Sequence, residues 1–294
     1  METRHLRGKA VADHIRSELA GDIKQLKSSG VIAGLAAVLI GEDPASQMYV
    51  RSKARAFAKA QCFSKTYHLP AETSETELLK LIRKLNIDSR FHGILIQLPL
   101  PKHIDSNRIL NSVDPRKDVD GFHPVNLGHL MVGQPRVIPC TPHGILKMME
   151  FYQIPTSGRA AVILGRSTIV GKPMAALLGH NTPYGNATVT MCHTRTRDIW
   201  AITSQADILI AASGQPGLIS GKVIKQGVDI IDVGINRVED DSEKGYRIEG
   251  DVNFESVQGI AASITPVPGG VGVMTITMLL YNTVQAALRA VLGK

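Results

Sequence analysis

Short apolar runs alternate with stretches of helical periodicity along the whole chain. Six runs have the length and composition of buried strands: GLAAVLIG (34–41), GILIQLPL (93–100), AAVILG (160–165), ATVTMC (187–192), ADILIAAS (206–213) and VDIIDVGI (228–235). Helical patterns lie between them, for example at 75–85, 142–152 and 172–179. Continuous apolar strands separated by helices are typical of parallel sheets covered on both faces. The pattern predicts an α/β fold.

In the second half of the chain, predicted strands and helices follow one another at shorter intervals, and this difference predicts two domains. A strand at 160–164 leads into a glycine-containing turn and a helix, and further strands follow near 187–192, 207–211 and 228–233. This βαβ succession is typical of a dinucleotide-binding domain. The Pro/Gly-rich segment ITPVPGGVGVMT then returns the chain toward its first half. We therefore predict an N-terminal α/β substrate domain of residues 1–139 plus 270–294, and a Rossmann-type domain of residues 140–269.

The turn after the strand at 160–164 resembles a phosphate-binding loop. It reads GRSTIVGKP, so Ser167 stands where a strict GxGxxG motif has its second glycine, and a glycine turn without a ligand is the alternative. The next strand ends in CHTRTRD, with no carboxylate before Asp198. NAD enzymes commonly place an acidic residue there, whereas arginine can bind the 2′-phosphate of NADP. Solvated surface arginines are the alternative for Arg195 and Arg197, but the balance favours NADP over NAD.

One helical segment carries a lysine inside its apolar face. In YVRSKARAFAKA, the residues Arg51, Arg55 and Lys59 share one face at i, i+4 spacing, whereas Lys53 falls among apolar residues. The ordinary explanation is a lysine that buries its stem and keeps its ammonium group in water. The functional alternative is a lysine enclosed in a pocket for acid–base chemistry.

Two further polar residues occupy positions that invite a functional reading. Gln97 follows an apolar strand and precedes two prolines in GILIQLPLP, so its amide needs partners. Asp120 precedes glycine in the turn DVDG, where aspartate is common for conformational reasons alone. Taken singly, each residue is explained by local structure.

Composition and charge restrict the class of protein. The chain has 294 residues, a net charge of +7 and only 4% aromatic residues; its basic residues are dispersed, which favours small anionic ligands over nucleic acid. Three scattered cysteines suggest neither a disulfide framework nor a metal site and favour a reducing cytoplasmic compartment. The apolar run near the C-terminus is interrupted by Asn282, Gln285 and Arg289, so we expect an amphipathic helix and no membrane span.

Taken together, the motifs resemble one family over nearly the whole chain. They are GEDPASQMYVRSK, GILIQLPLP, KDVDGFHPVNLG, PCTP, GRSTIVGKP, CHTRT, DVGINR, GDV and ITPVPGGVGVMT, in this order. They are similar to the bifunctional methylenetetrahydrofolate dehydrogenase/methenyltetrahydrofolate cyclohydrolase family. The resemblance implies NADP-dependent oxidation of methylenetetrahydrofolate, then hydrolysis to formyltetrahydrofolate in one cleft between two domains. It also implies a cytoplasmic homodimer serving one-carbon metabolism and purine biosynthesis.

The resemblance also assigns residues. It implies that Lys53 is the key catalytic residue, that Gln97 bonds to and tunes it, that Tyr49 lies against the pterin, and that Asp120 holds the pterin N–H groups. Leu98, Pro268, Gly269 and Gly270 would complete the substrate site, and Gly165, Arg166, Ser167, Thr194 and Ile235 would bind NADP. Tyr49 and Lys53 lie one helical turn apart, so a pterin on the tyrosine would bring its reacting carbon near the ammonium group.

Two alternatives stay open on the sequence alone. The first is an NADP-dependent dehydrogenase of another small substrate with the same two-domain organisation. The second is a catalytically silent nucleotide- or nucleic-acid-binding module, suggested by the pI of about 9.3. Val273 and His129 depart from the family pattern, which has proline and arginine there, but neither is a proposed catalytic or phosphate-binding residue.

Overall fold

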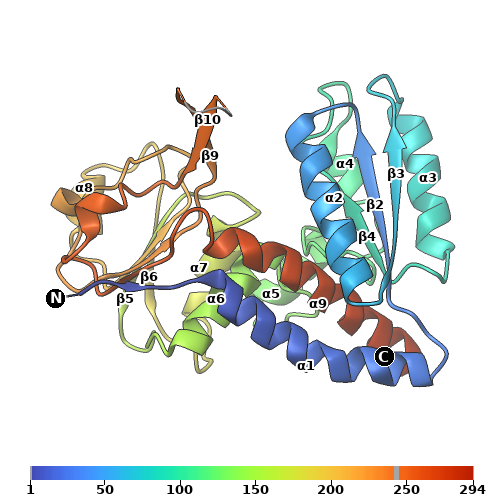
Figure 1. The fold of residues 1–294 in the computed structure, drawn as a ribbon, viewed down its shortest axis with the longest axis horizontal. Coiled ribbons are helices and arrows are strands. Elements are labelled where there is room, and N and C mark those ends of the chain that lie inside the picture. Colours follow the sequence, from blue (N-terminus) through green and yellow to red (C-terminus); the bar gives the residue numbers. More distant parts are fainter. Residues whose placement is uncertain (1, 242–244, 294) are drawn as a thin grey trace. The chain divides into compact units, whose positions relative to one another are not determined.

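The computed structural model describes residues 2–241 and 245–293, which form two compact units (Figure 1). Unit 1 consists of the residues up to Asp13 together with Thr141–Thr275. Unit 2 consists of His14–Cys140 and the residues from Ile276 on. Each unit is described separately.

Unit 2 is built on a three-stranded parallel sheet in the order β3-β2-β4. The strands are β2 (Gly34–Ile40), β3 (Phe63–Leu69) and β4 (Gly93–Ile96). All seven residues of β2 are buried, as expected for a central parallel strand. Alternate residues of β2 pack against α3 (Glu75–Ile87), whose N-terminus has a capping box between Ser74 and Glu77, while α2 (Pro44–Lys59) contacts β2 and β3.

The remaining helices of unit 2 include most of α1 (Gly8–Ser28), α4 (Ser106–Leu110), α5 (Pro124–Met131) and the part of α9 (Val271–Val291) from Ile276. Among the described residues, α9 alone is long and apolar enough to cross a membrane by length and composition. The expectation that this segment is too polar to span a membrane is therefore wrong by length and composition. However, 61% of its most apolar window is buried inside the protein, as in the core helix of a soluble fold.

Unit 1 contains a six-stranded parallel sheet in the order β1-β11-β8-β7-β5-β6. Its strands are β1 (Arg4–His5), β5 (Ala160–Leu164), β6 (Thr188–Cys192), β7 (Ile208–Ala211), β8 (Asp229–Asp232) and β11 (Ser263–Ile264). The chain leaves β5 to one side for β6 and returns on the other side for β7, which creates a topological switch point beside β5.

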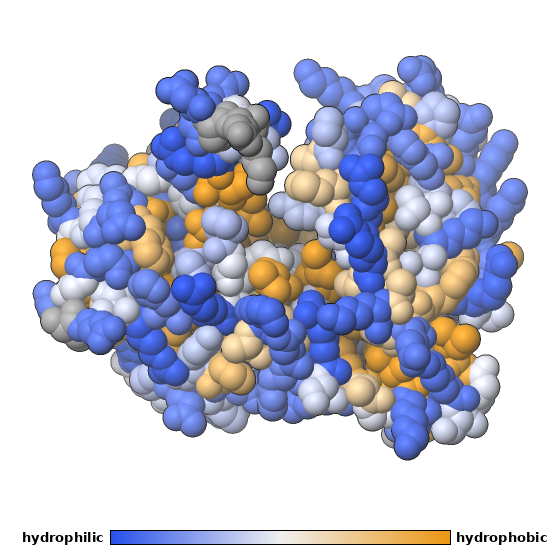
Figure 2. Space-filling model, viewed as in Figure 1, coloured by the Kyte–Doolittle hydropathy of each residue, from blue (hydrophilic) through white to orange (hydrophobic). Residues whose placement is uncertain are grey.

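Helices and turns connect these strands. They are α6 (Cys140–Tyr152), α7 (Gly171–Gly179), α8 (Ile199–Thr203), 3₁₀ turns at Gly221–Val223 and Glu255–Val257, and an antiparallel hairpin of β9 (Asn236–Glu239) and β10 (Tyr246–Glu249). Buried aliphatic residues from β5, β7, β8 and β11 form the core. On the face seen in Figure 2, hydrophilic residues separate the exposed apolar ones into small patches.

The predicted α/β fold with parallel strands is confirmed, since each of the six predicted strands is present within its apolar run. The domain boundaries differ from our prediction at the N-terminus. We placed the first residues in the substrate domain, whereas residues up to Asp13 group with unit 1 because β1 pairs with β11 through Arg4 and Ser263. The division also falls at Thr275 and not near residue 270. Residues 1 and 294, which the predicted ranges include, lie outside the described residues.

Candidate functional site

Lys53 has a specific polar partner within unit 2. Its ammonium group donates a hydrogen bond of 3.1 Å to Oε1 of Gln97, and the Lys53 residue is half-buried. Gln97 Nε2 donates to the carbonyl of Leu98 at 2.8 Å, and the Gln97 backbone N–H donates to Val38 at 2.9 Å. The amide is thus held at both ends, and the lysine is paired with a neutral group.

Sheet topology explains why these two residues meet. Gln97 directly follows β4, and three residues separate the end of β2 from the start of α2, so both lie at the carboxyl edge of one parallel sheet. Asp43 caps α2 by accepting a hydrogen bond of 2.7 Å from Ser46 N–H, which fixes where the helix starts. The carboxyl edge is where open α/β sheets usually bind ligands.

Tyr49 lies one turn before Lys53 on α2 and is 36% exposed. Because residues four apart share a helix face, its ring and the ammonium group project from the same side of α2. A planar ligand on the exposed ring would therefore lie within one turn of the lysine.

Asp120 reaches the same edge by another route. Lys117 and Asp118 lie alongside β4. Ile94 forms a parallel bridge with Asp118, and the Ile94 N–H donates to the carbonyl of Lys117 at 2.8 Å. Burial raises the pKa of the Asp120 carboxyl group to about 6; the charge of Lys53 lowers it, that of Asp118 raises it, and a weak hydrogen bond from the Cys140 thiol lowers it. The site thus combines a half-buried lysine with a half-buried carboxyl group.

Asp118 organises this turn and was missed by sequence reasoning. Its carboxylate accepts hydrogen bonds from the backbone N–H groups of Gly121 (3.0 Å) and His123 (2.9 Å) and from Asn126 Nδ2 (2.8 Å). Asp118 is only 6% exposed, so it acts as a structural anchor beneath the turn. The available signal was the presence of two aspartates, Asp118 and Asp120, two residues apart in the motif KDVDG.

The candidate phosphate loop of unit 1 lies between β5 and α7. A Cβ at Gly165 would lie 2.2 Å from the Ala212 carbonyl oxygen, and one at Gly171 would lie 2.1 Å from the Gly165 carbonyl oxygen, so both positions need glycine. Ser167 Oγ accepts from Val170 N–H at 3.1 Å and orders the turn. Ser167 and Arg166 are exposed, leaving a tight loop at a helix N-terminus open to an anion.

The loop after β6 lies beside this turn, because Leu164 of β5 pairs with Cys192 of β6. It carries exposed Thr194, Arg195 and Arg197, and no carboxylate occurs in residues 193–197. The backbone N–H of His193 donates to Thr196 Oγ1 at 2.9 Å, which closes the loop into a turn. This cationic loop beside a glycine-dependent turn fits the adenosine 2′-phosphate of NADP.

Ile235 follows β8 at the same carboxyl edge and is 49% exposed. Its loop is fixed by Asp232, whose carboxylate accepts from the N–H groups of Gly234, Asp251 and Val252, each at 2.9 Å. Burial raises the pKa of Asp232 to about 6, opposed by these backbone hydrogen bonds. The motifs DVGINR and GDV thus meet, and the aspartates in both motifs are anchors that our residue assignments omitted.

Pro268, Gly269 and Gly270 lie in unit 1 between β11 and α9, whereas Tyr49, Lys53, Gln97, Leu98 and Asp120 lie in unit 2. The glycine pair contacts the start of α1: Gly8 N–H donates to Gly269 at 2.9 Å, and a Cβ at Gly8 would lie 2.1 Å from the Gly270 carbonyl oxygen. The segment is therefore held in place within its own unit.

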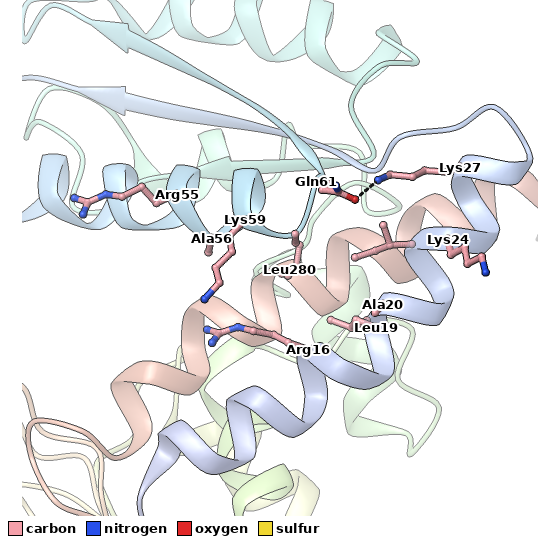
Figure 3. A pocket seen from close by; sticks show the side chains of 12 residues that line it. Arg16, Leu19, Ala20, Lys24, Lys27, Arg55, Ala56, Lys59, Gln61 and Leu280 are labelled. Atoms are coloured by element: carbon pink, nitrogen blue, oxygen red, sulfur yellow. Dashed lines mark hydrogen bonds between the residues drawn. The ribbon is translucent and has the colours of Figure 1, made fainter.

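Unit 2 has a separate recess of about 650 Å³ among α1, α2 and α9 (Figure 3). None of the predicted site residues lines it. Its cationic side chains come from Arg16, Lys24, Lys27, Arg55 and Lys59, above an apolar floor that includes Leu19. Among the described residues, no group of three or more His, Cys, Asp or Glu side chains could hold a metal ion.

Comparisons with known proteins identify the family. Residues 6–120 match the tetrahydrofolate dehydrogenase/cyclohydrolase catalytic domain, and residues 139–291 match the NAD(P)-binding domain of the same family. The bifunctional protein FolD of Moorella thermoacetica is 53% identical over 98% of this chain and 100% of its own length.

Two solved structures are similar to this chain over nearly its whole length. The crystal structure of the bifunctional FolD enzyme from Campylobacter jejuni is 47% identical, covers 98% of this chain and 99% of its own, and has a TM-score of 0.92. The Trypanosoma brucei FolD structure, complexed with NADP and an inhibitor, is 38% identical, covers 99% of both chains and has a TM-score of 0.93. This chain belongs to the tetrahydrofolate dehydrogenase/cyclohydrolase family.

Proposed function

We propose that this protein oxidises methylenetetrahydrofolate with NADP and then hydrolyses the methenyl product to formyltetrahydrofolate. The observation that carries the proposal is the hydrogen bond between Lys53 and Gln97 at the sheet edge that also holds Asp120. Hydride loss from the methylene carbon gives a cation without any proton transfer, whereas hydrolysis of that cation needs a proton-transfer group beside the substrate. Family membership supports both activities.

The residues of unit 1 fit the nicotinamide cofactor. When bound, NADP supplies the acceptor for the hydride that leaves the methylene carbon. Gly165, Arg166 and Ser167 would hold its pyrophosphate at the start of α7, and the loop with Thr194 would hold its 2′-phosphate. Ile235, exposed after β8, would provide an apolar contact.

Loss of the hydride leaves a substrate cation delocalised over two nitrogen atoms, and the second step hydrolyses it. Water adds to the carbon and releases a proton, after which one carbon–nitrogen bond breaks and the departing nitrogen takes up a proton. The added hydroxyl group loses its remaining proton to solvent as the formyl C=O forms. Lys53 can serve both transfers, accepting a proton from the water as the amine and donating one as the ammonium group. The fixed Gln97 amide keeps Lys53 Nζ in place through both.

Asp120 would anchor the pterin end. As a carboxylate it accepts hydrogen bonds from the pterin amino and ring N–H groups, and two such bonds define the orientation of a planar ring. A pKa of about 6 leaves the group mostly ionised at neutral pH, as this role requires. Folate binding should therefore weaken as the pH falls below about 6, which a pH series of the folate KM would measure.

The proposal predicts which residues set the cofactor preference. Replacing Arg195 with alanine should raise the KM for NADP by roughly 10-fold or more, since a charge-assisted hydrogen bond contributes about 1.5–3 kcal/mol. The KM for NAD should be unchanged, because NAD has no 2′-phosphate. Steady-state kinetics with both cofactors measures this for Arg195→Ala.

The exposed Lys222 provides the control, since Lys222→Ala removes the same charge from the 3₁₀ turn Gly221–Val223 of unit 1. It should leave both KM values unchanged. An equal loss for NADP and NAD in Arg195→Ala would show that this side chain does not bind the 2′-phosphate.

The test of the function is a two-wavelength assay with methylenetetrahydrofolate and NADP. Reduced nicotinamide and the methenyl intermediate are followed separately. We expect reduction, with decay of the methenyl signal faster than in buffer. If NADP is reduced but the methenyl signal decays at its rate in buffer, the protein has no cyclohydrolase activity. If neither signal appears, the alternative is a dehydrogenase of another substrate, which a screen of small substrates with NADP would detect.

We further propose a cytoplasmic homodimer whose product feeds one-carbon metabolism and purine biosynthesis. Three free cysteines are compatible with a reducing compartment. The outer strand β6 of unit 1 has an unpaired edge and leaves Met191 37% exposed, which supports pairing with a second copy. Light scattering on the purified chain tests the dimer, and fractionation tests the compartment.

A further inference from the structure

Asn282 is a buried polar residue in the middle of the apolar helix α9. It is 4% exposed, and its neighbours Leu279 and Leu280 are 1% exposed. A buried amide in such a setting is retained only where its hydrogen bonds are made, because an unpaired buried polar group destabilises the fold. The proposed chemistry does not use Asn282, so its partners are informative.

The amide of Asn282 bonds to two backbone carbonyls from different segments. Nδ2 donates to Val119 O at 2.9 Å and to Ile138 O at 3.0 Å. The first oxygen belongs to the peptide group whose nitrogen is that of Asp120. Because a peptide group is planar, fixing its oxygen fixes the orientation of the Asp120 N–Cα bond.

The second hydrogen bond, from Asn282 to Ile138 O, supports the turn after Asp120 as well. Ile138 O belongs to the peptide group that leads into Pro139, and a Cβ at Gly121 would lie 2.8 Å from Pro139 N. Gly121 has φ +78°, which favours glycine for a second reason. Asn282 therefore ties together the two segments between which the turn after Asp120 is packed.

Asp118 holds the turn on its other side through the hydrogen bonds to Gly121 and His123. Asp120 thus has a local anchor in the sequence before it and a distant anchor 162 residues away in α9. The Cys140 thiol completes the contact, with its Sγ 3.3 Å from Val119 O and 3.8 Å from Asp120 Oδ1.

We propose that Asn282 is a positioning residue for Asp120, holding the carboxylate where it can take both N–H groups of the pterin. This inference rests on the proposed function. Asn282 contacts neither substrate nor cofactor and acts through the backbone of the Asp120 turn, by its hydrogen bonds to Val119 O and Ile138 O.

The variant Asn282→Ala removes both donors and lets that peptide group rotate. We expect the KM for methylenetetrahydrofolate to rise by roughly 10-fold, the effect of losing one well-placed hydrogen bond to a charged group. The methenyl substrate should be affected equally, because both substrates present the same pterin edge. The KM for NADP and the affinity for NADP should stay unchanged.

The control is Gln285→Ala in the same helix. Gln285 Nε2 donates to Asp22 Oδ2 at 2.9 Å, away from the turn, so its loss should leave both folate KM values unchanged. Asn282→Ser, which keeps one donor, should lie between the wild type and Asn282→Ala. Equal KM increases in the Gln285 and Asn282 variants would overturn the inference in favour of general loosening of α9.

A double-mutant cycle with Asp120→Asn provides the decisive measurement. Tetrahydrofolate binding is measured by calorimetry for the wild type, Asn282→Ala, Asp120→Asn and the double variant. If Asn282 acts through Asp120, its replacement has no further effect once the carboxylate is gone. Full additivity overturns the inference; if Asn282→Ala does not fold, the cycle is run with Asn282→Ser. Absence of tetrahydrofolate binding by the wild type would instead refute the proposed function.

Discussion

Replacing Lys53 with methionine is expected to abolish cyclohydrolase turnover while leaving the fold and NADP binding intact. Methionine keeps the length of the stem but removes the ammonium group that bonds to Gln97 at 3.1 Å. General acid–base catalysis typically contributes about 10²–10⁴-fold, so the decay of the methenyl signal should fall close to its rate in buffer. The NADP affinity should not change, because the cofactor residues lie in unit 1.

The matched control is Lys59→Met on the same helix. Lys59 is exposed and occupies the last position of α2, so the same chemical change there removes no contact with Gln97. Circular dichroism and thermal melting establish that both variants fold. Full retained turnover in Lys53→Met would show that the proton transfers belong to another group or to water.

The sequence pattern predicted the parallel strands well because buried parallel strands are continuous apolar runs. It did not predict β3, whose residues Phe63–Leu69 lie at the edge of the sheet, are all at least partly exposed and include Lys65 and His68. It also missed β1, because a two-residue strand such as Arg4–His5 is defined only by its pairing with β11. Local pattern carries no information on such distant partners.

The candidate site shows the same limit. Lys53, Gln97 and Asp120 were selected through motif resemblance, whereas ordinary local explanations were available for each. The structure supplies the contacts that distinguish these explanations, such as the Lys53–Gln97 bond across 44 positions. The roles of Asp118, Asp232 and Asn282 were not predicted because these residues hold backbone groups, and their partners are visible only after folding.

Replacing Asp120 with asparagine should separate function from stability. Asparagine offers one acceptor oxygen where the carboxylate offers two, and it has no charge to meet the pterin N–H groups. The loss of a charge-assisted pair of hydrogen bonds should weaken folate binding by roughly 100-fold or more. The folate KM in the dehydrogenase assay and tetrahydrofolate calorimetry both measure this.

The same variant should be more stable than the wild type at alkaline pH. The pKa of Asp120 is raised from 3.8 to about 6 by burial, so the folded state binds the proton more tightly than the unfolded chain does. The resulting stabilisation is fully present below about pH 3.8 and is lost as the pH rises through 6. At pH 8 the ionised group therefore destabilises the fold by about 3 kcal/mol relative to acid pH, and Asp120→Asn removes this penalty.

Asp114 gives a control of opposite sign. A hydrogen bond from Arg116 lowers the pKa of Asp114, so its carboxylate stabilises the fold at neutral pH and loses this effect as the pH falls through that lowered pKa. Denaturant unfolding at pH 5 and pH 8 should show Asp120→Asn gaining stability over the wild type as the pH rises, with no such gain for Asp114→Asn. If the unfolding free energies of the two variants depend on pH in the same way, the ionised Asp120 carboxylate does not destabilise the fold. Asp120 would then destabilise the fold in its ionised form while its loss weakens folate binding. Folate binding, and not stability, would explain why an aspartate occupies this position.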